Sequence, residues 1–219
     1  MSLSFNEIEA AALKAARGAG FSWGLAEEAG FAARWLAERG LDWLPALLAV
    51  CEAQLSRGET TVGLSGHLLG PGAGSDSLCP LRVGAWIADL GAVGEDGYEV
   101  HKLRHPILLL PFLDLASRQA GPIALSILPA SGAPSQVFVV CQGALHADRA
   151  DAPCPTLVLA SVQRVQAPAV GASRPLLARP AAVDPALRLR LAALEARTYV
   201  PASRHSRLAG AGAGLTDND

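Results

Sequence analysis

The spacing of the apolar residues changes along this chain, and that change limits the folds that it can adopt. Before Gly58 they recur at steps of three and four, as in Leu44, Leu48 and Cys51, which is the repeat of an amphipathic helix. Beyond Gly121 they form short runs, rich in β-branched residues, between turns of proline, glycine and aspartate, which is typical of strands. Helices that come first and strands that come later favour an α+β fold, in which an N-terminal helical layer packs on a small sheet, with a C-terminal helix and a glycine-rich tail.

Capping residues set the ends of three N-terminal helices. Ser4 and Glu7 have the spacing of a capping box, so a first helix starts here, and we expect it to stop at Gly18. A second helix is predicted from Ser22 to Gly40, and a third from Asp42 to Gly58.

Helices and strands alternate in the middle of the chain. Five glycines and a proline between residues 60 and 77 predict a loop, after a short strand at 60–64. Of the later helices, one is predicted to begin at Leu108 or beyond, because that start leaves Pro111 in the first turn, where its missing N–H is harmless. The remaining predicted elements are helices at 81–90 and 184–197 and strands at 98–103, 123–128, 136–142 and 156–165. The apolar runs of the last three strands are nearly continuous, which predicts burial on both faces of the sheet.

These elements divide the chain into four stretches, which we expect to form a single folded domain. They are a helical N-terminal layer at 1–58, a mixed helix and strand core at 59–166, a linker with the C-terminal helix at 167–199 and a tail at 200–219. Leu208 and Leu215 are apolar residues that a solvated tail does not need, so the tail is expected to pack on its own or a neighbouring subunit.

The composition argues against several classes of protein. A net charge of −2 and a pI near 6.2 argue against nucleic-acid binding, since binders of nucleic acid carry a basic face. The chain shows no run of about twenty apolar residues and no signal peptide, which predicts no membrane partner. Four cysteines without a CxxC pair suit the reduced thiols of the cytoplasm. With 51% hydrophobic and only 17% charged residues, a monomer has few charges to cover its surface, so we expect a homo-oligomer.

Two motifs near the start of the second helix suggest chemistry, and each has an ordinary structural explanation. Residues 20–24 match the GxSxG nucleophile elbow, but a helix and not a strand precedes Ser22, which suits the serine better as a helix cap. Glu27 and Glu28 beside Trp23 are candidates for an acid site next to an aromatic wall. Acidic residues in a first turn are also favoured by the helix dipole alone.

Glycines and arginines provide weaker candidates for ligand binding. Gly72 and Gly74 could cradle an anion ahead of the helix at 81–90, although no lysine follows as in a P-loop. Arg204 and Arg207 in the tail are candidates to bind a carboxylate or a phosphate. In both segments, flexible chain is the simpler reading.

His101 and His105 are four residues apart, the spacing of two metal ligands on one helical face. Pro106 disfavours helix at His105 and no third ligand lies nearby, so no metal site is predicted and no cofactor is implied. His101 remains a candidate for acid–base chemistry.

Both ends of the chain resemble a bacterial family known only as a domain of unknown function. The resemblance rests on residues 14–20, 23–30 and 34–36 and on the ending from Thr198 to Asp219. It implies no activity and no site residue. The helical N-terminus is also similar to the malate and L-lactate dehydrogenases that lie outside the Rossmann class.

Two hypotheses of different classes follow. The first is a non-catalytic binding or assembly protein that acts beside a bacterial metabolic enzyme, which suits the apolar composition. The second is a small-molecule enzyme whose acid–base pocket lies between the helices and the sheet and uses Glu27, Glu28, His101 or Arg207. Whether the chain is an enzyme stays open at this point.

Overall fold

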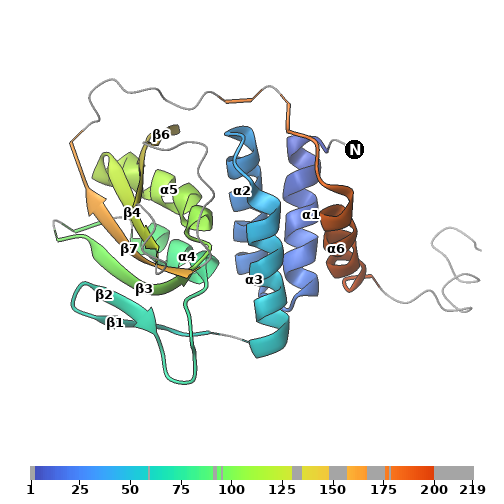
Figure 1. Ribbon diagram of the computed structural model, residues 1–219, viewed down its shortest axis with the longest axis horizontal. Coiled ribbons are helices and arrows are strands. Elements are labelled where there is room, and N and C mark those ends of the chain that lie inside the picture. Colours follow the sequence, from blue (N-terminus) through green and yellow to red (C-terminus); the bar gives the residue numbers. More distant parts are fainter. Residues whose placement is uncertain are drawn as a thin grey trace, which may run out of the picture.

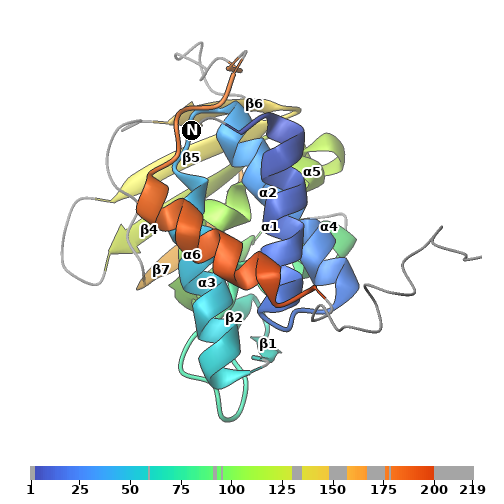
Figure 2. The same cartoon turned by 90° about the vertical axis from the view of Figure 1, so that its right-hand side faces the viewer.

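The computed structural model places an N-terminal group of helices beside a mixed sheet (Figure 1). It describes residues 3–58, 60–90, 93–94, 96–129, 135–147, 157–166, 176–177 and 179–199. The N-terminal helices are α1 (Phe5–Gly18), α2 (Trp23–Glu38) and α3 (Trp43–Arg57), and the C-terminal helix α6 (Pro185–Ala196) packs against α1 and α3. Figure 2 shows α6 lying across these two helices. The α+β class is therefore confirmed.

The predicted caps define the ends of these helices. Ser4 and Glu7 form the capping box, with the Ser4 N–H donating to Glu7 Oε2 at 2.6 Å and the Glu7 N–H to Ser4 Oγ at 3.2 Å. Ser22 Oγ accepts from the Leu25 N–H and caps α2, as predicted in place of a nucleophile elbow. Asp184 caps α6 in the same way, whereas the Asp42 side chain makes no capping hydrogen bond.

Helix α1 ends at Gly18, as predicted, but Gly18 is not the left-handed cap that is usual for a glycine at a helix end. The helix includes Gly18, and Gly20, with φ +94°, is the residue that turns the chain. Gly18 is needed for a different reason: a Cβ there would lie 1.9 Å from the backbone oxygen of Leu194 in α6. The Arg197 side chain at the end of α6 also donates from Nε to the Gly18 oxygen at 2.8 Å, so the end of α6 lies directly on the end of α1.

The described part of the sheet has seven strands in the order β1-β2-β3-β7-β4-β5-β6, and only β2 and β3 pair in parallel. The strands are β1 (Val62–Ser65), β2 (Leu68–Pro71), β3 (Tyr98–Arg104), β4 (Ile123–Pro129), β5 (Gln136–Cys141), β6 (Ala144–Ala147) and β7 (Leu157–Arg164). Two of them, β2 and β6, were not predicted. Each completes a tight hairpin with the strand before it, so the glycine-rich loop expected at 60–77 is partly a hairpin.

Three shorter helical segments lie between the sheet and the N-terminal helices. They are α4 (Pro80–Leu90), the 3-10 helix η1 (Pro106–Leu109) and α5 (Leu110–Ala120). Helix α5 packs on β4 and β5, while α2 contacts α4, η1 and α5. Pro111 sits in the first turn of α5, as predicted. The helical layer at 1–58 therefore contacts the sheet mainly through these segments.

The two faces of the sheet differ in burial, contrary to the expectation that both are buried. Side chains of one face, such as Leu125, Phe138 and Val162, belong to the core. On the opposite face Leu128 is 46% exposed and Leu159 is 37% exposed. The apolar runs thus supply a core on one side only.

The structure leaves some predictions untested. In the described ranges no helix is long and apolar enough to cross a membrane. The predicted tail at 200–219, with Arg204, Arg207, Leu208 and Leu215, and most of the linker at 167–180 lie outside the described residues.

Candidate functional site

The acidic and aromatic candidates lie on the first turns of α2. Trp23 is 63% exposed, and the guanidinium carbon of Arg17 lies 4.7 Å from its ring centroid, a cation–π contact. Glu28 is half-buried, and its pKa is raised by burial and by the nearby charges of Asp89 and Glu27. These residues are not among the described lining residues of either of the two pockets described below.

The glycine and histidine candidates have structural surroundings of their own. The Gly72 N–H donates to the Thr61 oxygen at 3.0 Å, and a Cβ at Gly72 would lie 2.1 Å from Thr61 Oγ1. Gly72 therefore serves the close approach of two chain segments, and Gly74, with φ +82°, serves a turn. His101 lies on β3, half-exposed, with Nε2 3.6 Å from Glu99 Oε2. No group of three metal-ligating side chains occurs among the residues described.

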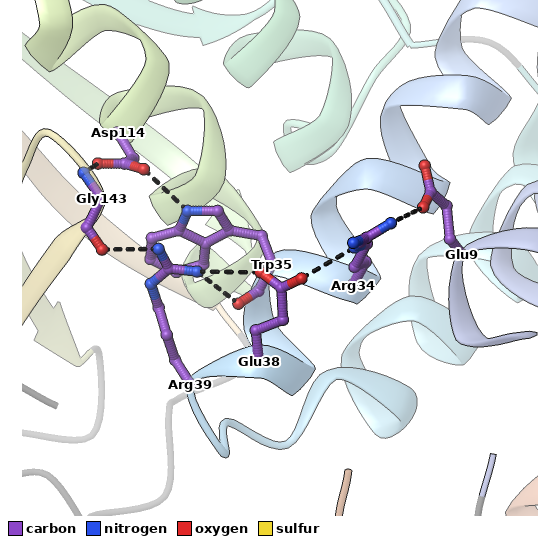
Figure 3. Close-up of polar contacts among 7 residues, drawn as sticks. All are labelled: Glu9, Arg34, Trp35, Glu38, Arg39, Asp114 and Gly143. Atoms are coloured by element: carbon purple, nitrogen blue, oxygen red, sulfur yellow. Dashed lines mark hydrogen bonds and ion pairs between the residues drawn. The ribbon is translucent and has the colours of Figure 1, made fainter. Parts of the chain in front are cut away.

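Figure 3 shows a buried polar network that the sequence did not reveal. Asp114 on α5 is 2% exposed, and its carboxylate accepts two hydrogen bonds. Trp35 Nε1 of α2 donates to Oδ2 at 2.9 Å, and the Gly143 N–H of the β5–β6 turn donates to Oδ1 at 2.7 Å. One side chain thus ties the helical layer to the edge of the sheet.

Arg39, just after α2, completes this network from the other side. Its Nη2 donates to the Gly143 oxygen at 2.7 Å, and its Nη1 donates to the Trp35 oxygen at 3.0 Å. The guanidinium lies over the Trp35 ring, 3.7 Å from the centroid. Burial lowers the pKa of Arg39, and the charges of Asp114 and Glu38 oppose this effect.

The network continues to the surface through Glu38 and Arg34. Glu38 lies within ion-pair distance of Arg39, at 3.8 Å, and accepts from Arg34 Nε at 2.8 Å. Arg34 Nη1 pairs in turn with Glu9 of α1 at 2.9 Å (Figure 3). Because Asp114 and Arg39 both bind fixed backbone groups, this network positions α2 against α5 and the β5–β6 turn.

A pocket lies between α3 and the start of α4, and we call it the arginine pocket. Arg57 ends α3 on one side of it, and Arg104 ends β3 on the other. The cavity itself has a volume of about 20 Å³, which is room for about one water molecule. The other described lining residues are Phe21, Val50, Ala53, Gln54, Gly58, Thr60, Ser77, Cys79 and Pro80.

Polar groups of the arginine pocket converge from three segments. Arg104 Nε donates to Ser77 Oγ at 2.6 Å, and Arg57 Nη1 lies 3.6 Å from the exposed Asp76. Burial raises the pKa of the Cys79 thiol, while backbone hydrogen bonds from Arg82 and Leu81 act against that rise. Cys79 is therefore protonated at neutral pH in the resting pocket.

A second pocket runs along the segment before α6. It lies between the α2–α3 turn and residues 180–184, and Gly40, Trp43, Val183 and Leu187 line part of it. Two acidic residues, Asp42 and Asp184, are among its described lining residues. The Asp184 side chain already accepts a hydrogen bond as the cap of α6.

The sheet presents an apolar surface on the side away from α5, which we call the outer face. Leu128 pairs with Leu159, and Ser126 with both Ser161 and Val137. Residues opposite each other on neighbouring strands point to the same side of a sheet. The outer face comprises Ala124, Ser126 and Leu128 of β4, Val137, Val139 and Cys141 of β5, and Leu159, Ser161 and Gln163 of β7.

The sequence analysis missed the arginine pocket and the buried network. Only the hairpin turn that contributes Gly143 to the network has a recognisable sequence pattern. Gln142 and Gly143 both have positive φ, and glycine after a polar residue is typical of a two-residue hairpin turn. That signal could have located β6. Arg57, Arg104 and Cys79 are far apart in sequence, and no spacing connects them.

Comparisons with known proteins give a family match over part of the chain and no activity. The sequence matches no curated protein. A solved structure of malate dehydrogenase from Entamoeba histolytica is similar over 74% of this chain and 49% of that chain, with 11% identity and a TM-score of 0.45. The chain thus spans about half the length of that enzyme, and no property of the enzyme is carried over. Residues 3–73 match the family described as a protein of unknown function (DUF3726), which confirms the expected resemblance to an uncharacterised family over this part of the chain.

Proposed function

We propose that this chain is a non-catalytic assembly protein that pairs with a second copy of itself through the outer face. The single observation that carries this proposal is the row of apolar side chains on a sheet face that no described helix covers. Leu128 and Leu159 lie side by side there, and they are among the most exposed leucines of the strands.

An open face of an antiparallel sheet normally alternates apolar residues toward the core with polar residues toward water. The centre of the outer face departs from this rule, because its described positions on β4, β5 and β7 include no charged residue. A charge comes in at its border, where Glu99 of β3 lies opposite Ser161. Val137 and Val139 are half-buried. Such a face favours contact with another apolar surface over contact with water.

A second copy suits this face because its centre is self-complementary. Two sheets that pack face to face interdigitate their side chains about 10 Å apart, as in a β-sandwich. Apolar and serine side chains provide no charges to repel an identical face. A two-fold axis through the outer face would therefore set Leu128 and Leu159 of each copy against apolar residues of the other.

The test is the solution mass of charge-introducing variants. L128E and L159E place a carboxylate on the outer face, and since both leucines are exposed in the single chain, neither change should disturb its core. The matched control is L189E, because Leu189 of α6 is 73% exposed on a different surface.

Size-exclusion chromatography with light scattering should give twice the chain mass of 22.6 kDa for the wild type and L189E, and the single-chain mass for L128E and L159E. An oligomer that L128E and L159E leave intact would overturn the proposal. A wild type that is monomeric until a different protein is added would also overturn it, in favour of a partner of another sequence.

A further inference from the structure

We propose that the second pocket is a docking groove for the tail of the same chain, the stretch at 200–219, whose arginines pair with the two carboxylates of the groove. The arginines are Arg204 and Arg207, and the carboxylates are Asp42 and Asp184. This groove is separate from the outer face, so the inference does not depend on self-association.

The second pocket has room for the side chains of a chain segment. Its own volume is about 390 Å³, which lies in the range of pockets that hold small ligands. One wall is the α2–α3 turn and the other is the segment 180–184. The chain just before that segment is held against the end of α2, because the Leu177 N–H donates to the Glu38 oxygen at 2.7 Å. Both walls of the groove are therefore attached to the helical layer.

The charge of the described lining favours a cation. Asp42 and Asp184 are its charged residues, and the described lining includes no arginine, lysine or histidine. The tail has the opposite charge where it leaves α6: Arg204 and Arg207 precede its first carboxylate, Asp217. Guanidinium groups bind carboxylates through paired N–H donors, so the two surfaces are complementary.

Both carboxylates have acceptor oxygens to spare. The Asp42 side chain makes no capping hydrogen bond to α3, and no described arginine or lysine pairs with it. Partial burial raises the pKa of the Asp42 carboxyl, an effect that a bound cation would counteract. Asp184 accepts the N–H groups of Ala186, at 2.7 Å, and Leu187, at 3.4 Å, through Oδ1. Its Oδ2 accepts no hydrogen bond from the residues described.

The tail is long enough to return along α6 to the groove. The groove lies at the first turn of α6, and the tail follows its last turn, so the return path is about the length of this 12-residue helix, or about 18 Å. The eight residues from Val200 to Arg207 span up to about 27 Å when extended, which leaves chain for a turn. We therefore expect Arg207 to make the main contact, and Arg204 lies near the limit of this path.

The apolar part of the groove suits the residue that follows Arg207, which is Leu208. Trp43, Leu44 and Leu187 are among the described lining residues. Burial of a leucine side chain adds a favourable term that solvent does not screen, unlike an exposed ion pair. The groove thus matches the tail in charge and in apolar character at two adjacent positions.

Trypsin tests this docking on the full chain, because it cleaves after Arg204 and after Arg207. A free peptide of residues 198–219 gives the rate for the same bonds without the groove. Intact-mass spectrometry should show both cleavages in the folded wild type to be more than tenfold slower than in the peptide, since cleavage needs the undocked tail. Equal rates in protein and peptide would overturn the proposal, and this comparison does not depend on the folding of any variant.

Variants then assign the protection to the groove. D42N and D184N should each speed the cleavage about fivefold, the upper end of what an exposed ion pair contributes, and asparagine at 184 still caps α6. D96N is the matched control, because Asp96 is an exposed carboxylate outside the groove, and it should change neither rate. R207Q should speed the cleavage after Arg204, whereas R207K keeps the charge and should leave that cleavage slow.

Two results would contradict this assignment. Protection that both D42N and D184N leave unchanged would show that the tail does not dock in the second pocket. Protection that is lost on dilution would show that the tail docks on a neighbouring copy and not on its own chain. Slow cleavage at every protein concentration, relieved by D42N and D184N but not by D96N, is the result that the proposal predicts.

Discussion

The indole nitrogen of Trp35 donates a 2.9 Å hydrogen bond to Oδ2 of Asp114, which joins α2 to α5 in the interior of the protein. Both side chains are buried, and the second carboxylate oxygen is held by the Gly143 N–H. This contact is the central link of the buried network, because it fixes the helical layer and the β5–β6 turn to the same residue.

Asp114→Ala should lower the free energy of unfolding by about 3 kcal/mol, because it leaves two buried donors without an acceptor and removes one of the two carboxylates that act on Arg39. Asp114→Asn keeps the shape of the side chain and one acceptor oxygen, so it should lower the free energy of unfolding by less than Asp114→Ala does. Urea denaturation followed by tryptophan fluorescence measures both. A loss below about 1 kcal/mol for D114A would mean that the network does not join these layers.

Gly18→Ala should displace α6, because the added Cβ would lie 1.9 Å from the Leu194 oxygen. Overpacking of this kind costs about 2 kcal/mol. Gly24→Ala is the matched control: Gly24 lies in α2, and a Cβ added there would have no other atom within 4 Å, so alanine should raise the free energy of unfolding by up to about 1 kcal/mol. Thermal unfolding of the two variants tests the pair, and equal melting temperatures would show that α6 does not dock on α1 as described.

The sequence predicted the helix starts, which depend on residues close together in the chain. It missed strands whose pairing partners lie far away in the sequence. Ser4, Ser22 and Asp184 act on N–H groups within three residues, so the helix starts could be read directly. The strand β2 depends on a parallel pairing with β3, across a helix, and its own four residues carry no distinct pattern. The packing role of Gly18 was missed because a glycine that permits close helix packing looks the same in sequence as one that only ends a helix.

The candidate site was harder to predict than the fold. The acidic residues of α2 could be found as candidates because they are adjacent in sequence. The two arginines of the arginine pocket, Arg57 and Arg104, are 47 positions apart, so no sequence pattern connects them. Burial on both faces of the sheet was inferred from continuous apolar runs. The single chain buries one face more fully than the other, and the same runs give the outer face its apolar side chains.

Glu28→Gln should stabilise the protein at neutral pH. The pKa of Glu28 is raised in the folded state, so the folded protein holds the proton more tightly than the unfolded chain. The free energy of unfolding therefore falls as pH rises from 4.5 through the folded-state pKa, and it stays lower above that. Melting temperatures of E28Q and wild type should differ at pH 7 and converge near pH 4. D96N, at an exposed carboxylate, is the control, and a gap that is the same at both pH values would contradict the assignment.

Cys51 should resist alkylation in the folded protein. Burial raises the pKa of its thiol to about 12, so almost none is ionised at pH 8. Cys51, Cys79 and Cys141 are free thiols, whereas Cys154 lies outside the described residues. A thiol reagent should count four thiols after denaturation without reductant, with Cys51 reacting only then. Fast reaction of Cys51 in the native state would show that the α3 core opens readily.

The mass of the wild-type protein in solution tests the assembly proposal most directly. Sedimentation equilibrium across micromolar concentrations should return twice the 22.6 kDa chain mass, because a buried pair of apolar outer faces favours association without a ligand. A mass of 22.6 kDa across that range would contradict the proposal that the outer face is covered by a second copy.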